Sequence, residues 1–161
     1  MIILGIDPGF ERIGIAIIEK DGKGKEVLLY SECFKTSAKL PFYERILLIG
    51  EKIESISKEY KPKALAIEKL FFTTNQKTVM GVAEARGVII YSAIKHGLQV
   101  FEYTPPQIKI AVTGYGKSDK SAVMSMVPKL IKIEKVIKSD DELDAIAIGL
   151  TCTASERFPQ I

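Results

Sequence analysis

The chain has 161 residues, of which 47% are hydrophobic and 27% are charged, and its formal net charge is +3. These values predict one domain, residues 1–161, with a hydrophobic core of ordinary size. The only cysteines, Cys33 and Cys152, lack metal-ligand spacing. Asp7 interrupts the first apolar run, so the sequence does not predict a signal peptide. No apolar run reaches the ~18 residues of a membrane span. We therefore expect a cytoplasmic protein with reduced thiols and no membrane partner.

The N-terminal third predicts three strands and a helix. IILGID, IGIAIIEK and EVLLYSECF are apolar runs separated by a turn at Pro8-Gly9 and by the glycine-rich DGKGK, which predicts an antiparallel meander. Residues 42–60 repeat apolar side chains at close to the helical period, and Lys61-Pro62 ends that helix. ALAIE, which follows, is a short buried strand.

The rest of the chain predicts one more strand and four helices. A long helix over 76–96 ends at Gly97, and LQVFEY forms the fifth strand. Pro105-Pro106 begins a short helix, TGYGKSDKS is a loop, another helix runs to about residue 131, and the last helix begins at Ser139. This order predicts an α/β fold, a five-stranded mixed sheet flanked by helices.

The last helix opens with the acidic stretch SDDELDAIAIGL. Ser139 and Glu142 have the spacing of a capping box, in which Glu142 folds back on the Ser139 amide, and acids in a first turn suit the helix dipole. Asp144 is not explained in this way, because it lies among apolar residues where an unpaired carboxylate costs ~2–7 kcal/mol. We therefore expect a positive group to face Asp144.

Two other carboxylates each end an apolar strand: Asp7 closes IILGID and Glu68 closes ALAIE. If these strands are parallel neighbours, both acids emerge at one sheet edge, where Asp141 and Asp144 from one face of the last helix complete a cluster. Taken singly, Asp7 is also consistent with a turn residue and Glu68 with a partner of a lysine.

An all-oxygen cluster favours Mg²⁺ or Mn²⁺ over zinc. Residues 101–138 carry seven lysines and three acids, and residues 139–161 carry five acids and Arg157. A basic segment beside an acidic one suits phosphate held next to a cation site, although a solvated lysine face gives the same pattern. Together these features predict hydrolysis of a phosphodiester with two metal ions.

The motifs ILGIDPG, AIEKLFFTTN, EARG and DELDAIAIG, in this order and spacing, resemble those of the RuvC-type Holliday junction resolvases, over roughly residues 1–155. The resemblance implies an RNase H-like fold and a homodimer that makes two symmetric nicks in four-way junction DNA, in recombination and repair, acting with RuvA and RuvB. It places the catalytic, metal-binding acids (two Mg²⁺ per site) at Asp7, Glu68, Asp141 and Asp144. It also places a junction-inserting aromatic at Phe71, beside Phe72, and phosphate-contacting lysines at Lys109 and Lys120.

Two of these implications have independent support in the residues. Phe71 and Phe72 follow a strand that ends in an acid and suit stacking on unpaired bases, with core burial as the alternative for one of them. The helix over 76–96 is apolar on more than one face and carries Gly81, Ala85 and Gly87, which suits close packing across a two-fold axis; burial within the monomer is the alternative.

The segment AVTGYGKS resembles a phosphate-binding P-loop, but no buried strand precedes it, and we interpret it as a loop that presents Lys117 and Lys120 to DNA phosphates. Three other functions remain open: an RNase H-like nuclease acting on ribosomal RNA precursors, a phosphotransferase or ATPase with a similar first strand, and a non-catalytic junction-binding protein. The intact set of four acids argues against the last of these.

Overall fold

The computed structural model describes residues 1–70 and 76–157. Its strands are β1 (Ile2–Asp7), β2 (Arg12–Lys20), β3 (Glu26–Lys35), β4 (Ala64–Glu68) and β5 (Gln99–Tyr103). Its helices are α1 (Phe42–Tyr60), α2 (Gln76–Lys95), α3 (Pro105–Thr113), α4 (Lys120–Leu130) and α5 (Asp140–Ser155). These bounds lie within two residues of the predicted ones. The order of elements along the chain is therefore confirmed.

The five strands form one sheet in the order β3-β2-β1-β4-β5. The strands β1, β2 and β3 pair antiparallel, as the predicted meander requires, and β4 and β5 add to β1 in parallel. The predicted five-stranded mixed sheet is confirmed. Because β1 and β4 are parallel neighbours, their carboxyl ends meet at the same edge.

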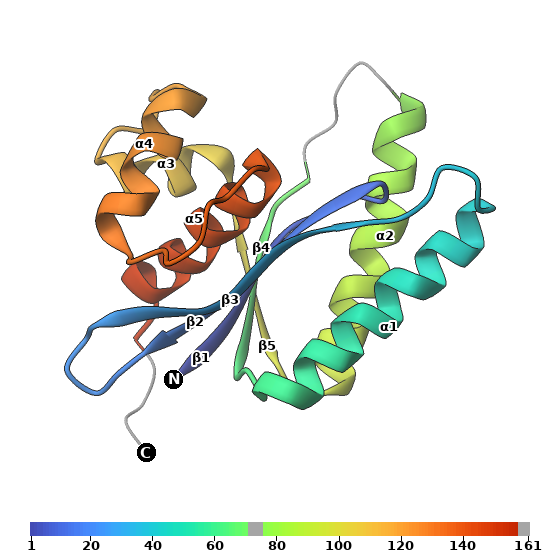
Figure 1. The fold of residues 1–161 in the computed structure, drawn as a ribbon, viewed down its shortest axis with the longest axis horizontal. Coiled ribbons are helices and arrows are strands. Elements are labelled where there is room, and N and C mark those ends of the chain that lie inside the picture. Colours follow the sequence, from blue (N-terminus) through green and yellow to red (C-terminus); the bar gives the residue numbers. More distant parts are fainter. Residues whose placement is uncertain (71–75, 158–161) are drawn as a thin grey trace.

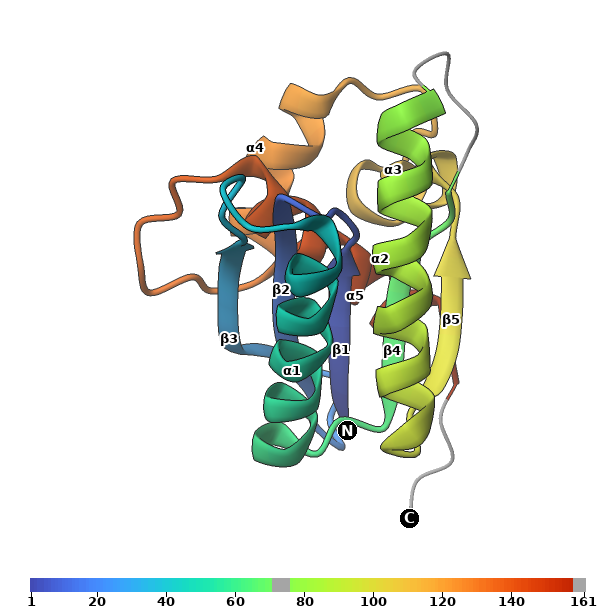
Figure 2. The same cartoon turned by 90° about the vertical axis from the view of Figure 1, so that its right-hand side faces the viewer.

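Helices cover both faces of the sheet (Figure 1). The helices α1 and α2 lie on one face, side by side in front of the strands in Figure 2, and α3, α4 and α5 lie on the other. Alternation along β1 supplies both cores: Leu4 and Ile6 pack under α1 and α2, while Ile3 packs toward α5. This two-sided burial explains why β1 reads as a continuous apolar run rather than an alternating one.

The sheet face under α5 is lined with small residues, which lets this helix approach closely. A Cβ atom added to Gly5 would lie 2.4 Å from the carbonyl oxygen of Ala145, and one added to Gly14 would lie 1.9 Å from that of Asp141. On the helix side, a Cβ atom added to Gly149 of α5 would lie 2.8 Å from the Ile18 side chain. Glycine is therefore required by space at Gly5 and Gly14, where an added Cβ would meet backbone, and this contact fixes the distance of α5 from the sheet.

The long helix α2 is partly buried within the monomer. Gly81 packs against the rings of Phe10 and Phe42. Ala85 and Ile89, on the same helix, are fully buried against the sheet. Of the two alternatives for Gly81 and Ala85, burial within the monomer is confirmed and the two-fold contact is wrong, because both residues face the protein's own core. Gly87 is different: a Cβ there would meet nothing within 4 Å.

None of the described helices combines the length and apolar character needed to cross a membrane.

Candidate active site

The two strand-end acids emerge side by side. Ile6 of β1 pairs in register with Ile67 of β4, so the residues that follow them, Asp7 and Glu68, occupy neighbouring strand ends. Both continue the alternation that turns Ile3 and Ala66 toward α5. Asp7 also pairs with Gly14 across β1 and β2, and the first turn of α5 rests on Gly14. The sheet thereby brings Asp7 and Glu68 under the helix that carries Asp141 and Asp144.

The carboxylates of Glu68, Asp141 and Asp144 lie close enough to Asp7 to act on its pKa. Burial, followed by repulsion from Asp144, Glu68 and Asp141, raises the pKa of Asp7 to about 8, although Lys120 acts in the opposite direction. Burial and Asp144 likewise raise the pKa of Glu68. The raised pKa values mean that negative charge is unfavourable in this cluster. The cluster therefore favours the binding of a cation that offsets the charge.

Asp144 has the positive partner that its sequence position demanded. The Lys120 ammonium lies 3.0 Å from Asp144 Oδ2 and 3.0 Å from Asp140 Oδ2. Burial raises the pKa of Asp144 and outweighs the opposing effect of Lys120. Burial alone would lower the pKa of Lys120, but its hydrogen bonds to the two carboxylates raise it, so Lys120 stays charged. The expectation that a cation faces Asp144 is confirmed.

Asp141 lies in a different environment from the other three acids. Its Oδ2 atom lies 2.5 Å from the Arg12 guanidinium, accepts a hydrogen bond from the Ser139 hydroxyl at 2.7 Å, and lies 3.6 Å from the Cys33 thiol. Burial acts to raise the pKa of Asp141, but the contacts with Ser139 and Arg12 outweigh it and leave the pKa below its ordinary value. Asp141 is therefore the member of the cluster that ionises most readily.

The donor set fits a hard divalent cation in its chemistry. The four acids supply only oxygen, and their mutual repulsion is the kind that a cation offsets. In the described part of the chain, however, no three Asp, Glu, His or Cys side chains are arranged to hold a metal ion with their present rotamers. One oxygen of each helix acid already has a cationic partner: Asp141 Oδ2 contacts Arg12, and Asp144 Oδ2 contacts Lys120.

The predicted capping box at the start of α5 is wrong. Ser139 occupies the N-cap position, but its side chain makes no capping hydrogen bond. Its hydroxyl instead accepts from Arg12 at 2.9 Å and donates to Asp141. Glu142 does not fold back on Ser139; it is buried and pairs with Lys135, which also donates to the Ser31 carbonyl. Partners from distant parts of the chain have displaced the local motif.

The remaining predicted site residues are more scattered. Lys109 is half-buried on α3, and Lys117 is exposed in the turn between α3 and α4. Phe71 and Phe72 lie outside the described residues. The segment TGYGKS follows a helix, α3, and not a strand, so the setting of a phosphate-binding P-loop is missing from this described stretch.

Two arginines at the site were not identified from the sequence. Arg12 starts β2 and contacts Asp141; no signal in the sequence marks it, since a charged residue after a turn is ordinary. Arg86 of α2 donates to the backbone carbonyl of Glu68 at 3.2 Å and pairs with Glu102. Arg86 belongs to the EARG motif, so that motif was the available signal.

Comparison with known proteins agrees with this geometry. The family model "Crossover junction endodeoxyribonuclease RuvC" matches residues 3–152. Proteins of that name from Desulfitobacterium hafniense and Alkaliphilus oremlandii are 43% and 42% identical, over 93% and 100% of this chain and 90% and 98% of theirs.

The fold agrees with solved structures of the same family. The structure of T. thermophilus RuvC in complex with Holliday junction substrate superposes with a TM-score of 0.89 at 31% identity, covering 96% of this chain and 93% of that one. A second structure, of Thermus thermophilus RuvC, gives a TM-score of 0.85 at 33% identity, over 94% and 92% of the two chains. The RNase H-like fold implied by the motifs is confirmed, and the chain belongs to the crossover junction endodeoxyribonuclease RuvC family.

Proposed function

We propose that this protein is a crossover junction endodeoxyribonuclease that resolves four-way DNA junctions by two symmetric nicks, in recombination and repair. The observation that carries the proposal is the convergence of Asp7, Glu68, Asp141 and Asp144 at one sheet edge, in a chain of the RuvC family. The related T. thermophilus protein, whose structure is a complex with Holliday junction substrate, supports the choice of DNA substrate. A nuclease for ribosomal RNA precursors and a non-catalytic junction-binding protein have less support.

The four acids are proposed as the metal ligands. A divalent metal ion is implied by membership of this family of nucleases; we propose two Mg²⁺ per site, with Mn²⁺ able to substitute, because all donors are oxygen. When bound, such ions activate water and stabilise the leaving oxygen of a phosphodiester. Asp7 and Glu68 supply fixed ligands from adjacent strands. Asp141 and Asp144 supply ligands from α5, whose position Gly5 and Gly14 set.

Basic and aromatic residues around the acids are proposed to hold the DNA. Lys120, which contacts Asp144, is proposed to meet the phosphate that enters the site, and Lys109 and Lys117 are proposed to extend the positive charge along α3 and the following turn. The family resemblance supports Phe71, with Phe72 beside it, as the aromatic pair that stacks on opened bases. Phosphate contacts of this kind give affinity and position, whereas the shape of the junction gives selectivity.

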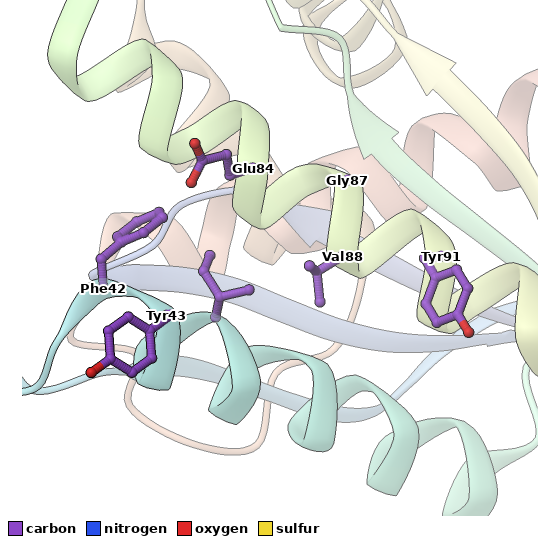
Figure 3. Close-up of a pocket in the computed structure, with 7 residues that line it drawn as sticks. Phe42, Tyr43, Glu84, Gly87, Val88 and Tyr91 are labelled. Carbon is purple, nitrogen blue, oxygen red and sulfur yellow. The ribbon is translucent and has the colours of Figure 1, made fainter.

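A homodimer is proposed because two symmetric nicks need two sites. An open groove of about 390 Å³ lies between α1 and α2, lined in part by Phe42, Tyr43, Val88 and Tyr91 (Figure 3). Tyr43 is 72% exposed and Tyr91 66% exposed. Further exposed apolar side chains lie on the same two helices: Leu47, Met80 and Ile94. A second copy of the chain that covers this face would bury them.

The family resemblance also supports RuvA and RuvB as partners in branch migration, and a cytoplasmic location follows from a chromosomal DNA substrate.

The function is tested with a synthetic four-way junction and a linear duplex of matched sequence, each incubated with and without Mg²⁺. Paired nicks in the junction that require Mg²⁺ support the proposal. Equal cutting of the duplex, or binding without any cutting, contradicts it.

A further inference from the structure

We propose that Arg12 and Ser139 are positioning residues that hold the Asp141 carboxylate in one orientation, so that its Oδ1 atom is the one offered to a divalent cation. The inference rests on the proposed function, because it takes Asp141 to be a metal ligand. It concerns residues outside the acid cluster. Neither Arg12 nor Ser139 touches the reacting atoms in this proposal, and both act through Asp141.

The hydrogen bonds and the ion pair that the described residues make with the Asp141 side chain all fall on one oxygen, Oδ2. Arg12 Nη2 lies 2.5 Å from Asp141 Oδ2 and donates to Ser139 Oγ at 2.9 Å, while Ser139 Oγ donates to the same Oδ2 at 2.7 Å. The three groups therefore form a closed triangle, with the Cys33 thiol on Oδ2 as a fourth member at 3.6 Å. Arg12, Ser139 and Cys33 are called the Asp141 bracket below. The bracket fixes Oδ2 and leaves Oδ1 outside this set of contacts.

The bracket is assembled from separate parts of the fold. Arg12 begins β2, Cys33 lies on β3 and Ser139 precedes α5. Because β2 and β3 are paired, with Cys33 opposite Gly14, two members are fixed to the sheet on which α5 rests. The bracket therefore ties the orientation of one carboxylate to both the sheet and the helix. An orientation fixed from two sides suits a ligand that must meet acids on the neighbouring strand.

The Ser139 hydroxyl is used in an unusual way for its position. A serine at the N-cap ordinarily accepts a hydrogen bond from a first-turn amide. Ser139 makes no such bond, and its hydroxyl contacts Asp141 and Arg12 instead. Nor is the ion pair well placed to stabilise the fold, since the Arg12 side chain is 49% exposed and such pairs contribute little. Orientation of Asp141 is the role that accounts for both observations.

The alternative role for Arg12, as a counter-charge only, predicts the opposite change in cation affinity when Arg12 is removed. If Arg12 acted only as a counter-charge, its removal would strengthen cation binding, because a positive charge beside a cation site repels the ion. If Arg12 positions Asp141, its removal weakens cation binding; groups that orient a ligand from outside the coordination shell typically contribute 10–100-fold in metal affinity. Ser139→Ala changes no charge, so its effect reports orientation alone.

The test measures Mn²⁺ binding to the full chain by the electron paramagnetic resonance signal of free Mn²⁺, without DNA. We expect Arg12→Gln and Ser139→Ala each to weaken Mn²⁺ affinity by about 10-fold or more, and Arg12→Lys to restore part of the loss. Matched controls are Lys95→Gln, which removes an exposed charge paired with Glu54, and Ser125→Ala on α4. Both controls should bind Mn²⁺ as the unmodified protein does.

Tighter Mn²⁺ binding by Arg12→Gln, or an unchanged affinity for Ser139→Ala, overturns the proposal. Because Ser139→Ala is small and neutral, it decides the question if Arg12→Gln fails to fold. Junction cleavage, measured in parallel, separates this inference from the proposed function. Unmodified protein that binds Mn²⁺ with the expected variant losses but cuts no junction keeps the bracket and contradicts the nuclease. Unmodified protein that binds no Mn²⁺ overturns the bracket.

Discussion

Gly14 of β2 lies directly against the backbone carbonyl of Asp141, so closely that a Cβ atom on Gly14 would come within 1.9 Å of that oxygen. Gly14 is also the register partner of Asp7. Together with Gly5 of β1, Gly14 therefore sets the separation between the strand that carries the first acid and the helix that carries the third and fourth. The geometry of the site depends on this contact as much as on the acids.

Gly14→Ala should therefore disable the site. A Cβ that meets backbone must push α5 away from the sheet, and overpacking of this kind typically costs ~1–3 kcal/mol. We expect a lower melting temperature, together with loss of junction cleavage. Gly22→Ala is the matched control, because Gly22 lies in the turn after β2 where an added Cβ meets nothing within 4 Å. Normal cleavage by Gly14→Ala would show that α5 does not need this close approach.

The local parts of the fold were predictable from sequence, and the reasons are local. The bounds of α1 follow from its apolar period and from Lys61, which ends the helix with a left-handed φ of 50°. The strand β1 follows from its apolar run, and the shared edge for Asp7 and Glu68 follows from the parallel pairing of β1 with β4. Each of these features is determined by neighbouring residues or by a general rule of sheet topology.

The parts that were missed depend on partners far apart in the chain. Ser139 and Glu142 have capping-box spacing, yet Arg12 engages Ser139 from 127 residues away and Lys135 engages Glu142 from the preceding loop. For Gly81 and Ala85 the sequence left a dimer contact and burial within the monomer as alternatives, because a helical pattern does not say which apolar face meets the protein's own core. Tertiary contacts overrode the local preference in each case.

The contribution of Asp7 to the stability of the metal-free protein should fall as the pH rises from about 4 to about 8. The pKa of Asp7 is raised from 3.8 to about 8, so over this range the folded protein holds a proton that the unfolded chain has released. Asp7→Asn removes the contribution of Asp7 to that dependence, and above pH 8 it should melt several degrees higher than the unmodified protein in the presence of a chelator. The gap should close as the pH approaches 4. Parallel melting curves for the two proteins across this range would contradict the raised pKa.

The ion pair between Glu142 and Lys135 should stabilise the start of α5. The Glu142 side chain is 8% exposed and that of Lys135 is 49% exposed, so Lys135→Met leaves a buried carboxylate without its partner, a loss of about 1–3 kcal/mol or more. Glu142→Gln should cost less, because the freed Lys135 can reach water. Urea unfolding of both variants and of the double variant Lys135→Met/Glu142→Met measures the difference. A Lys135→Met variant as stable as the unmodified protein would place Glu142 in water.

Lys109→Ala and Lys120→Ala should weaken junction binding through lost phosphate contacts. Each contact contributes about 0.9 to the slope of log affinity against log salt, so each variant should lower the slope by about one unit. Lys23→Ala, in the turn at the far end of β2, is the control and should leave the slope unchanged. Binding titrations at several salt concentrations give the slopes. An unchanged slope for Lys109→Ala or Lys120→Ala would assign that lysine to the solvated surface.

The most direct test of the nuclease site is the cleavage of a supercoiled plasmid that extrudes a four-way junction, with Mg²⁺, by the unmodified protein and by single-acid variants. Two coordinated nicks across the junction convert the plasmid to a linear product, whereas a single nick leaves a relaxed circle. The unmodified protein should give linear product, and so should Asp140→Asn, because Asp140 contacts Lys120 at the exposed edge of the cluster. Asp7→Asn, Glu68→Gln, Asp141→Asn and Asp144→Asn should give none while still binding the junction. Linear product from any of these four variants would contradict the role assigned to that acid, and its absence with the unmodified protein would contradict the nuclease itself.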